Sequence, residues 1–515
     1  MSRPPDGSGT GENMFRPNIA IGGCLGIFAM VFCAPQCIAD ALGQNASAAD
    51  DPCLPFALPN ADFLFDSPKK VFAHYFYPFP LSINNKPASD DYYNANYLNK
   101  NGESAKWAAT GGYLRQRPLP VAVNSNKNWP FDNMQREVRM AIARGITGFT
   151  FDVLSAKEAA SSDSTHLQML LSAAHAVDPR FKILIMPDIS ALKSDSATVV
   201  DSIAVAASSP AAYRLADGRL VVSAFNAGAN SPDWWAAVIA QLKTRGIAIA
   251  FVPTFLGWKG QAAAFAPISH GFADWGTATA NGSQGMKGDA QLARGNYGKI
   301  YMMPVDPQQY RPKDSIYWEA GNSATFRNAW TSAIDGDADL VQLVTWSDFS
   351  ESSQIEPYTD ATLRTDIGTG FYNLNAYYAT WFLSGKQPPI THDVLYYFYR
   401  REPTDAASPA QSKPNKVVNS TPEDNIELLA FLTAPGELKI KIAGRTEVQN
   451  APAGITSFKV HTAPGTPIFS LSRGGSEVFS VSGPIQIFGS GGLPSGVIDM
   501  TYWSGSASRR GVCSL

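Results

Sequence analysis

The sequence predicts an α/β protein: a (β/α)8 TIM barrel followed by a C-terminal antiparallel β-sandwich domain. Eight short apolar runs alternate with stretches of helical periodicity over residues 71–346. This pattern is typical of a parallel sheet buried on both faces, and eight units favour a closed barrel over an open doubly wound sheet. After Pro388-Pro389 the runs instead alternate apolar and polar residues between Gly, Pro and Ser, as in an antiparallel sandwich.

The eight expected barrel strands are rich in β-branched and aromatic residues. In chain order they are VFAHYF (71–76), GITGFTFD (145–152), FKILIMPD (181–188), RLVVSAF (219–225), IAIAFVP (247–253), SHGFADW (269–275), KIYMMPV (299–305) and LVQLVTW (340–346). Helices fit between most of them; one opens at Ser231-Pro232 and ends before Gly246. No glycine-rich nucleotide-binding sequence follows the first run, so nucleotide binding has no support.

The C-terminal region is expected to consist of short alternating strands. They are LYYFY (395–399), NIELLAFL (425–432), ELKIKI (437–442), ITSFKV (455–460), PIFSL (467–471), VFSV (478–481), PIQIF (484–488) and VIDMTY (497–502), with a long exposed loop over 404–423. These patterns divide the chain into a signal peptide (1–41), a linker (42–69), the barrel (70–385), the sandwich (390–503) and a tail (504–515).

The N-terminus indicates export. Residues 19–38 form a long uncharged apolar run that follows Arg16 and leads into Ala39-Asp40-Ala41, the pattern of a secretory signal peptide. A retained membrane anchor is the alternative reading, and in both cases the rest of the chain lies outside the cytoplasm. We therefore expect a secreted protein, extracellular or periplasmic, with no membrane association once the signal peptide is cleaved.

Cysteine usage agrees with that compartment. Three of the five cysteines lie in the signal segment, so cleavage leaves Cys53 and Cys513. Two cysteines in an oxidising compartment most simply pair, and we predict this disulfide. Neither has the spacing of a zinc ligand, and we expect no metal and no cofactor.

Charge and composition limit the partners. The net charge is -3 and long Lys/Arg runs are absent, which argues against nucleic acid. Charged residues make up only 17%, while the chain contains 11 Trp and 19 Tyr. This balance suits a neutral polar ligand such as a polysaccharide. The sequence leaves the oligomeric state open.

The active site of a (β/α)8 barrel lies at the C-terminal ends of its strands. The stretch TWSDFSESSQIEP (345–357) follows the eighth strand and places Asp348 three residues before Glu351. Two carboxyls facing one mouth can perform glycoside hydrolysis, either as acid and base or as acid and nucleophile. A hydrogen-bonded turn with solvated acids is the alternative. Other residues at strand ends are candidate substrate contacts, namely His74, Tyr75, Asp188, Asn226, Asp274, Trp275 and Trp346, with Asp152 as a third catalytic candidate.

VQLVTWSDFSESSQIEP resembles the eighth-strand signature of glycoside hydrolase family 71, the α-1,3-glucanases or mutanases, whose usual form is TWNDYGESHYIGP. VFAHYF, GITGFTFD and KIYMMPVDPQQY are similar to further strands of that family, and the resemblance covers roughly residues 70–385. It implies hydrolysis of α-1,3-glucosidic bonds with inversion, and Asp348 and Glu351 match its acidic pair. Departures include Ser347 for Asn, and Asp152 where fungal members commonly show Asn.

We expect Glu351 to be the general acid, because its longer arm lies near Trp346 and Phe349, and Asp348 to be the general base. The alternatives are a glycosidase of the related family that cleaves α-mannosides internally, and a non-catalytic carbohydrate-binding or cell-surface protein. The linkage, and an endo or exo mode, stay open at this point.

Overall fold

The computed structural model describes residues 51–363, 367–490 and 496–513. The predicted signal peptide and the first part of the predicted linker lie outside these residues. Among the helices that are described, none has the length and apolarity needed to cross a membrane.

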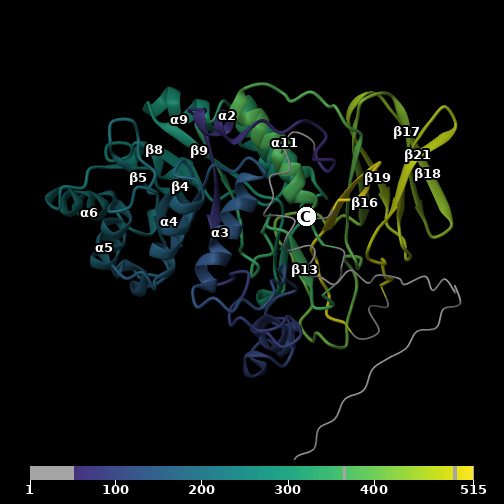
Figure 1. The fold of residues 1–515 in the computed structure, drawn as a ribbon, viewed down its shortest axis with the longest axis horizontal. Coiled ribbons are helices and arrows are strands. Elements are labelled where there is room, and N and C mark those ends of the chain that lie inside the picture. The colour runs from purple at the N-terminus through teal and green to yellow at the C-terminus, as the bar shows by residue number, and fades with distance from the viewer. Residues whose placement is uncertain (1–50, 364–366, 491–495, 514–515) are drawn as a thin grey trace, which may run out of the picture.

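Parallel strands form one sheet in the first part of the chain, on the left of Figure 1. They pair in the order β6-β5-β4-β3-β1-β12-β9-β8-β7. Only Val252 and Pro253 separate β6 (Ile249–Phe251) from β7 (Thr254–Phe255), so the two edges of the sheet are one stretch of chain and the barrel has eight strands. The others are β1 (Lys70–Tyr75), β3 (Gly148–Val153), β4 (Lys182–Pro187), β5 (Leu220–Val222), β8 (Gly271–Asp274), β9 (Ile300–Val305) and β12 (Leu340–Leu343). Each lies within or overlaps a predicted run, and the predicted fold class is confirmed.

Alternation along each strand separates two apolar layers. Phe72 of β1 packs with Leu184, Met302 and the other residues that fill the barrel interior. Its neighbours Val71 and Ala73 face the opposite way, into the larger core between strands and helices. The alternation continues to the end of β1, so only every second side chain there faces the mouth of the barrel.

Helices cover the outside of the barrel (Figure 1). They are α3 (Trp129–Ile142), α4 (His166–Val177), α5 (Ser196–Ala207), α6 (Pro232–Thr244), α7 (Ala262–Phe265), α8 (Ala280–Gly285), α9 (Asp289–Tyr297), α10 (Ala324–Asp335) and α11 (Gly370–Ser384). Ser231 caps α6 by accepting a hydrogen bond from the backbone N–H of Trp234, as Ser231-Pro232 predicts.

The C-terminal region contains two antiparallel sheets, at the yellow end of the chain in Figure 1. One has the order β19-β16-β14-β22-β23 and the other β18-β17-β20-β21. Leu428 of the first and Leu438 and Phe469 of the second share one buried cluster, so the sheets pack face to face. The strands are β14 (Val394–Tyr399), β16 (Asn425–Leu432), β17 (Gly436–Ile442), β18 (Arg445–Ala451), β19 (Gly454–His461), β20 (Ile468–Arg473), β21 (Ser476–Ser482), β22 (Trp503–Ser508) and β23 (Gly511–Val512).

The end of the chain differs from the prediction. Residues 497–502 form no strand in the structure, and β22 follows at Trp503–Ser508, so that all of it but Trp503 lies in the stretch expected to be a tail (504–515). Small residues are required in β22, because a Cβ on Gly505 would meet the hydroxyl of Tyr397 at 2.3 Å. Hydrogen bonding between two neighbouring strands, rather than alternation, therefore fixes this strand.

The segment before the barrel is packed rather than extended. A linker was expected over 42–69, but from Asp51 on, Leu54 and Phe56 are buried in the barrel core and α2 (Ala61–Asp66) follows. Cys53 is bonded to Cys513, with their Cα atoms 5.3 Å apart, the pairing that the sequence predicts.

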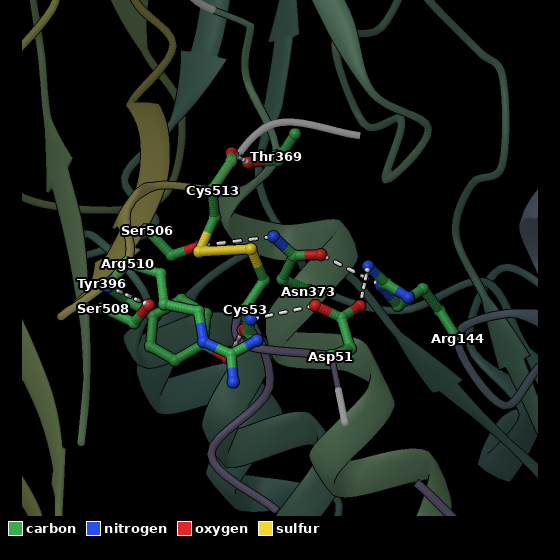
Figure 2. The surroundings of a disulfide bond; sticks show 10 residues. All are labelled: Asp51, Cys53, Arg144, Thr369, Asn373, Tyr396, Ser506, Ser508, Arg510 and Cys513. Atoms are coloured by element: carbon green, nitrogen blue, oxygen red, sulfur yellow. Dashed lines mark hydrogen bonds and ion pairs between the residues drawn. A yellow bond between two sulfur atoms is a disulfide. The ribbon is translucent and has the colours of Figure 1, made fainter. Parts of the chain in front are cut away.

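Polar contacts surround this disulfide (Figure 2). Asp51 accepts a hydrogen bond from the backbone N–H of Cys53 and pairs with Arg144 at the end of α3. Arg144 also donates to Asn373 of α11, and Asn373 donates to Ser506 of β22. The disulfide and these contacts join the start of the described chain, the barrel and the last sheet at one place.

Candidate active site

The turn after β12 positions Asp348 through its own backbone. The hydroxyl of Thr345 accepts a hydrogen bond from the N–H of Asp348 at 2.8 Å. The Oδ1 atom of Asp348 accepts from the N–H and hydroxyl of Ser350, at 2.9 and 2.7 Å, and from the N–H of Glu351 at 3.1 Å. Asp348 is thus both a turn cap and a candidate reactive group.

Burial sets the proton affinity of Asp348, whose exposed fraction is only 6%. Burial first, and then the charge of Glu351, raise the pKa of Asp348 to about 7, while the charges of His74 and Lys313 act in the opposite direction. A carboxyl with this pKa can carry a proton at neutral pH and deliver it to a leaving oxygen.

Glu351 has a different environment. Its Oε1 atom lies 2.7 Å from Nη2 of Arg311, and its Oε2 atom accepts a hydrogen bond of 2.5 Å from Gln309. An adjacent guanidinium favours the ionised form of a carboxylate. We expected Glu351 to be the proton donor, but its contacts are those of a carboxylate, and the buried carboxyl is Asp348.

Three predicted residues face the barrel interior near this pair. His74 and Asp152 follow the alternation of their strands, and the Nε2 atom of His74 lies 3.5 Å from Oδ2 of Asp152. The ring of Trp275 contacts that of His74 edge to face, with the centroids 4.8 Å apart. Asp188 lies close by: burial and then the charge of Asp152 raise the pKa of Asp188 to about 6. These residues form the floor beside Asp348, whose pKa responds to His74.

Two predicted substrate contacts point away from the mouth. Tyr75 is the neighbour of His74 on β1 and therefore faces outward, where its hydroxyl donates to Glu137 of α3 at 2.8 Å. Trp346 is fully buried against Phe149 and Tyr372 in the core outside the barrel. Neither can contact a sugar from there, so both assignments were wrong.

Two more predicted residues hold loops. Asp274 accepts hydrogen bonds from the backbone N–H groups of Gly257, Trp258 and Trp275, which fixes the loop after β7. Asn226 donates to the hydroxyl of Ser190 at 3.0 Å. Their observed contacts are structural.

The sequence reasoning missed the hairpin formed by β10 (Gln309–Arg311) and β11 (Ile316–Trp318), which follows β9. It supplies both partners of Glu351 and also Lys313. The signal was present in QQYR, where polar side chains alternate with an apolar one at the end of a barrel strand. Within the described part of the chain, no group of three or more His, Cys, Asp or Glu residues is arranged to hold a metal ion.

The chain is similar to several known proteins. The family model described as Glycosyl hydrolase family 71 matches residues 121–514. A glucan endo-1,3-alpha-glucosidase of Schizosaccharomyces pombe is 25% identical over 384 residues, which are 70% of this chain and 88% of the relative. The ascus wall endo-1,3-alpha-glucanase of the same organism is 23% identical over 410 residues, 70% of this chain and 90% of the relative. Among solved structures, a GH99 endo-alpha-mannosidase of Bacteroides thetaiotaomicron aligns with a TM-score of 0.45 and 14% identity, covering 61% of this chain and 97% of that one.

Proposed function

The chain belongs to glycosyl hydrolase family 71, and from this premise we propose that it is a secreted enzyme that hydrolyses the glucosidic bonds of α-1,3-glucan. The names of its relatives support the substrate. The observation that carries the chemistry is the pair at the mouth of the barrel: Asp348 is buried with a pKa of about 7, next to Glu351, which is paired with Arg311. A buried carboxyl that can carry a proton, beside a second carboxyl that contacts a guanidinium, is an arrangement suited to acid and base catalysis of glycoside hydrolysis.

In the proposed mechanism Asp348 is the general acid. It donates its proton to the glycosidic oxygen while the bond from the anomeric carbon to that oxygen breaks. Glu351, held as a carboxylate, takes a proton from a water molecule whose oxygen attacks the same carbon from the opposite face. The product sugar then has inverted configuration, and one proton transfer restores the two carboxyls.

This order of roles reverses the one that side-chain length suggests. Burial makes Asp348 the better proton carrier, and the guanidinium of Arg311 beside Glu351 disfavours a protonated Glu351. Trp275, His74 and Asp152 are the proposed contacts for the sugar ring, because they face the barrel interior beside Asp348.

The linkage is tested with insoluble α-1,3-glucan, soluble α-1,4-glucan and α-mannan. We expect release of reducing sugar from the first, and proton NMR of the earliest products should show the β-anomer. Preferred cleavage of α-mannan would replace the substrate assignment. Binding without any release of sugar would identify a non-catalytic carbohydrate-binding protein.

The roles are tested with Asp348→Asn and Glu351→Gln. Each should lower turnover of glucan by about 10²–10⁴-fold, the usual contribution of a general acid or base. On a 1,3-linked α-glucosyl oligosaccharide fluoride, whose leaving group needs no proton, Asp348→Asn should retain most of its activity and Glu351→Gln should not. Azide should rescue Glu351→Gln and give a β-glycosyl azide. The opposite pattern would restore Glu351 as the acid.

A further inference from the structure

The β10–β11 hairpin contacts Glu351 at three points. Gln309 and Arg311 lie two residues apart on one face of β10, and each donates to a different oxygen of the Glu351 carboxylate. The backbone N–H of Tyr310 donates to the Glu351 carbonyl at 2.8 Å. Both the charge and the backbone of Glu351 are therefore fixed by three consecutive residues.

The opposite face of β10 contacts the C-terminal region. Tyr310 is 1% exposed. Its hydroxyl can donate a hydrogen bond to Oδ1 of Asn415 at 3.1 Å or to the carbonyl oxygen of Ile498 at 3.2 Å. Its ring belongs to a buried cluster with Tyr317, Ile498 and Met500. The side chain of Tyr310 thus faces the C-terminal region, while those of its neighbours face Glu351.

The edge of the hairpin is bound by the same region. β11 pairs in parallel with β15 (Lys416–Val417), and these three strands form a sheet separate from the barrel sheet. Just beyond β11, Glu319 forms a buried ion pair of 2.9 Å with Arg400. Just before β10, Gln308 accepts a hydrogen bond from the N–H of Tyr502.

We propose that Gln309 and Arg311 are positioning residues for Glu351, and that residues 415–417 and 498–502 hold them in place, so that the C-terminal region is a working part of the catalytic site. The inference rests on the proposed function, since it assigns Glu351 the role of base. It deepens that function, because a C-terminal β-domain that only bound polysaccharide would have no need to contact the partner of a catalytic carboxylate.

The charged groups around Glu351 give the expected pH effect. The acidic groups that face it are Asp348 of the same turn and Asp306 at the end of β9, and burial raises the pKa of both. Both therefore carry protons on the acidic side of neutrality. Lys313, at the tip of the hairpin, acts on Asp348. Arg311 is the opposite charge in contact with Glu351. Its removal takes the opposite charge away from the Glu351 carboxylate, so the variant is expected to gain the charge of its base at higher pH.

The experiment measures kcat and KM on α-1,3-glucan oligosaccharides from pH 3 to 8 for the full chain. Arg311→Met should lower kcat about tenfold or more, with little change in KM, and should move the acidic limb of the kcat profile up by about one pH unit or more. Arg311→Lys should restore the position of the limb. Arg445→Met removes an exposed positive charge on β18 and is the matched control. It should leave kcat and the position of the acidic limb unchanged.

Tyr310→Phe tests the connection to the C-terminal region, because it keeps the ring and removes the hydroxyl. We expect kcat to fall about three- to tenfold, the value of a hydrogen bond or two, while the variant stays folded at the assay temperature. If the wild type hydrolyses glucan while Arg311→Met keeps its acidic limb, or Tyr310→Phe keeps full kcat, the inference is overturned. If the wild type hydrolyses no glucan, the proposed function fails first, and the inference falls with it.

Discussion

Two fully buried glutamates lie close enough to affect each other's proton binding, and we expect them to make the stability of the chain depend on pH. Glu137 of α3 and Glu356, five residues after Glu351, both have an exposed fraction of 0%. Glu137 accepts a hydrogen bond from Tyr75, but neither oxygen of Glu356 has a hydrogen-bond partner among the described residues. Burial raises the pKa of Glu137 to about 8, and burial together with Glu137 raises the pKa of Glu356 well above its usual range.

The direction in which stability changes with pH follows from the number of protons bound in the folded and unfolded chains. Burial raises the pKa of Glu356 in the folded chain above its value in the unfolded chain, so at a pH above the unfolded value the folded chain binds more protons than the unfolded chain. Stability is therefore highest at the acidic end of the range and falls as the pH rises. Each pH unit over which only the folded chain keeps this proton lowers the free energy of unfolding by about 1.4 kcal/mol.

Glu356→Gln removes this dependence, because glutamine has the shape of the protonated acid and no proton to lose. A buried amide without partners adds a penalty of about 1–3 kcal/mol, but that penalty is independent of pH. The measured quantity is thus the slope: urea unfolding at pH 5, 6, 7 and 8 should show the variant gaining on the wild type as the pH rises, by up to about 1.4 kcal/mol per unit. Glu447→Gln, at an exposed position, should run parallel to the wild type. A difference between Glu356→Gln and wild type that changes by less than about 1 kcal/mol across the window would refute the reasoning.

Other variants test single contacts. Cys53→Ser should lower the free energy of unfolding by about 2–5 kcal/mol, measured by thermal denaturation with and without reductant. Arg400→Met leaves the buried carboxylate of Glu319 unpaired and should cost about 3–5 kcal/mol, which Glu319→Gln in the same chain should partly recover. Gly505→Ala meets Tyr397 and should cost about 1–3 kcal/mol, whereas Gly285→Ala, in α8 with open space around it, should cost nothing. Finally, kcat should fall as the pH rises through about 7, where Asp348 loses its proton; a flat alkaline limb would contradict its role as the acid.

The barrel could be predicted because its strands are apolar on both faces. Runs such as FKILIMPD are apolar on both faces, since one face fills the interior and the other packs under helices. Two strands of the sandwich lack such a signal. β18 (RTEVQNA) is an edge strand with mostly exposed side chains, and β22 (WSGSAS) consists largely of small residues packed between neighbours. The two strands form because they hydrogen-bond to neighbouring strands, and their own amino-acid composition does not reveal these neighbours.

At the site, position along the strand was easier to predict than direction. His74 and Tyr75 both stand at the end of β1, but only His74 faces the interior, and the two faces of that strand are equally apolar in the sequence. Trp346 follows β12 by three residues, where regular alternation no longer applies, and its ring is buried outside the barrel. Closeness in the chain to a proposed catalytic residue is therefore weak evidence of contact with substrate.

Which carboxyl carries the proton depends on partners that the local sequence does not contain. Asp348 and Glu351 are three residues apart and share one turn, yet one is buried under its own backbone donors and the other is paired with Arg311. Gln309, the second partner of Glu351, is 42 residues away, and the strand that carries it is held by residues more than a hundred positions further on, around Asn415 and Ile498. Side-chain length alone favours the opposite order of roles to the one proposed here, because it leaves out desolvation and the guanidinium, whose effects on a carboxyl exceed that of one methylene group. The three-residue spacing of the two carboxyls therefore does not by itself decide which is the acid, because a cation from another segment can stabilise the charged form of either one.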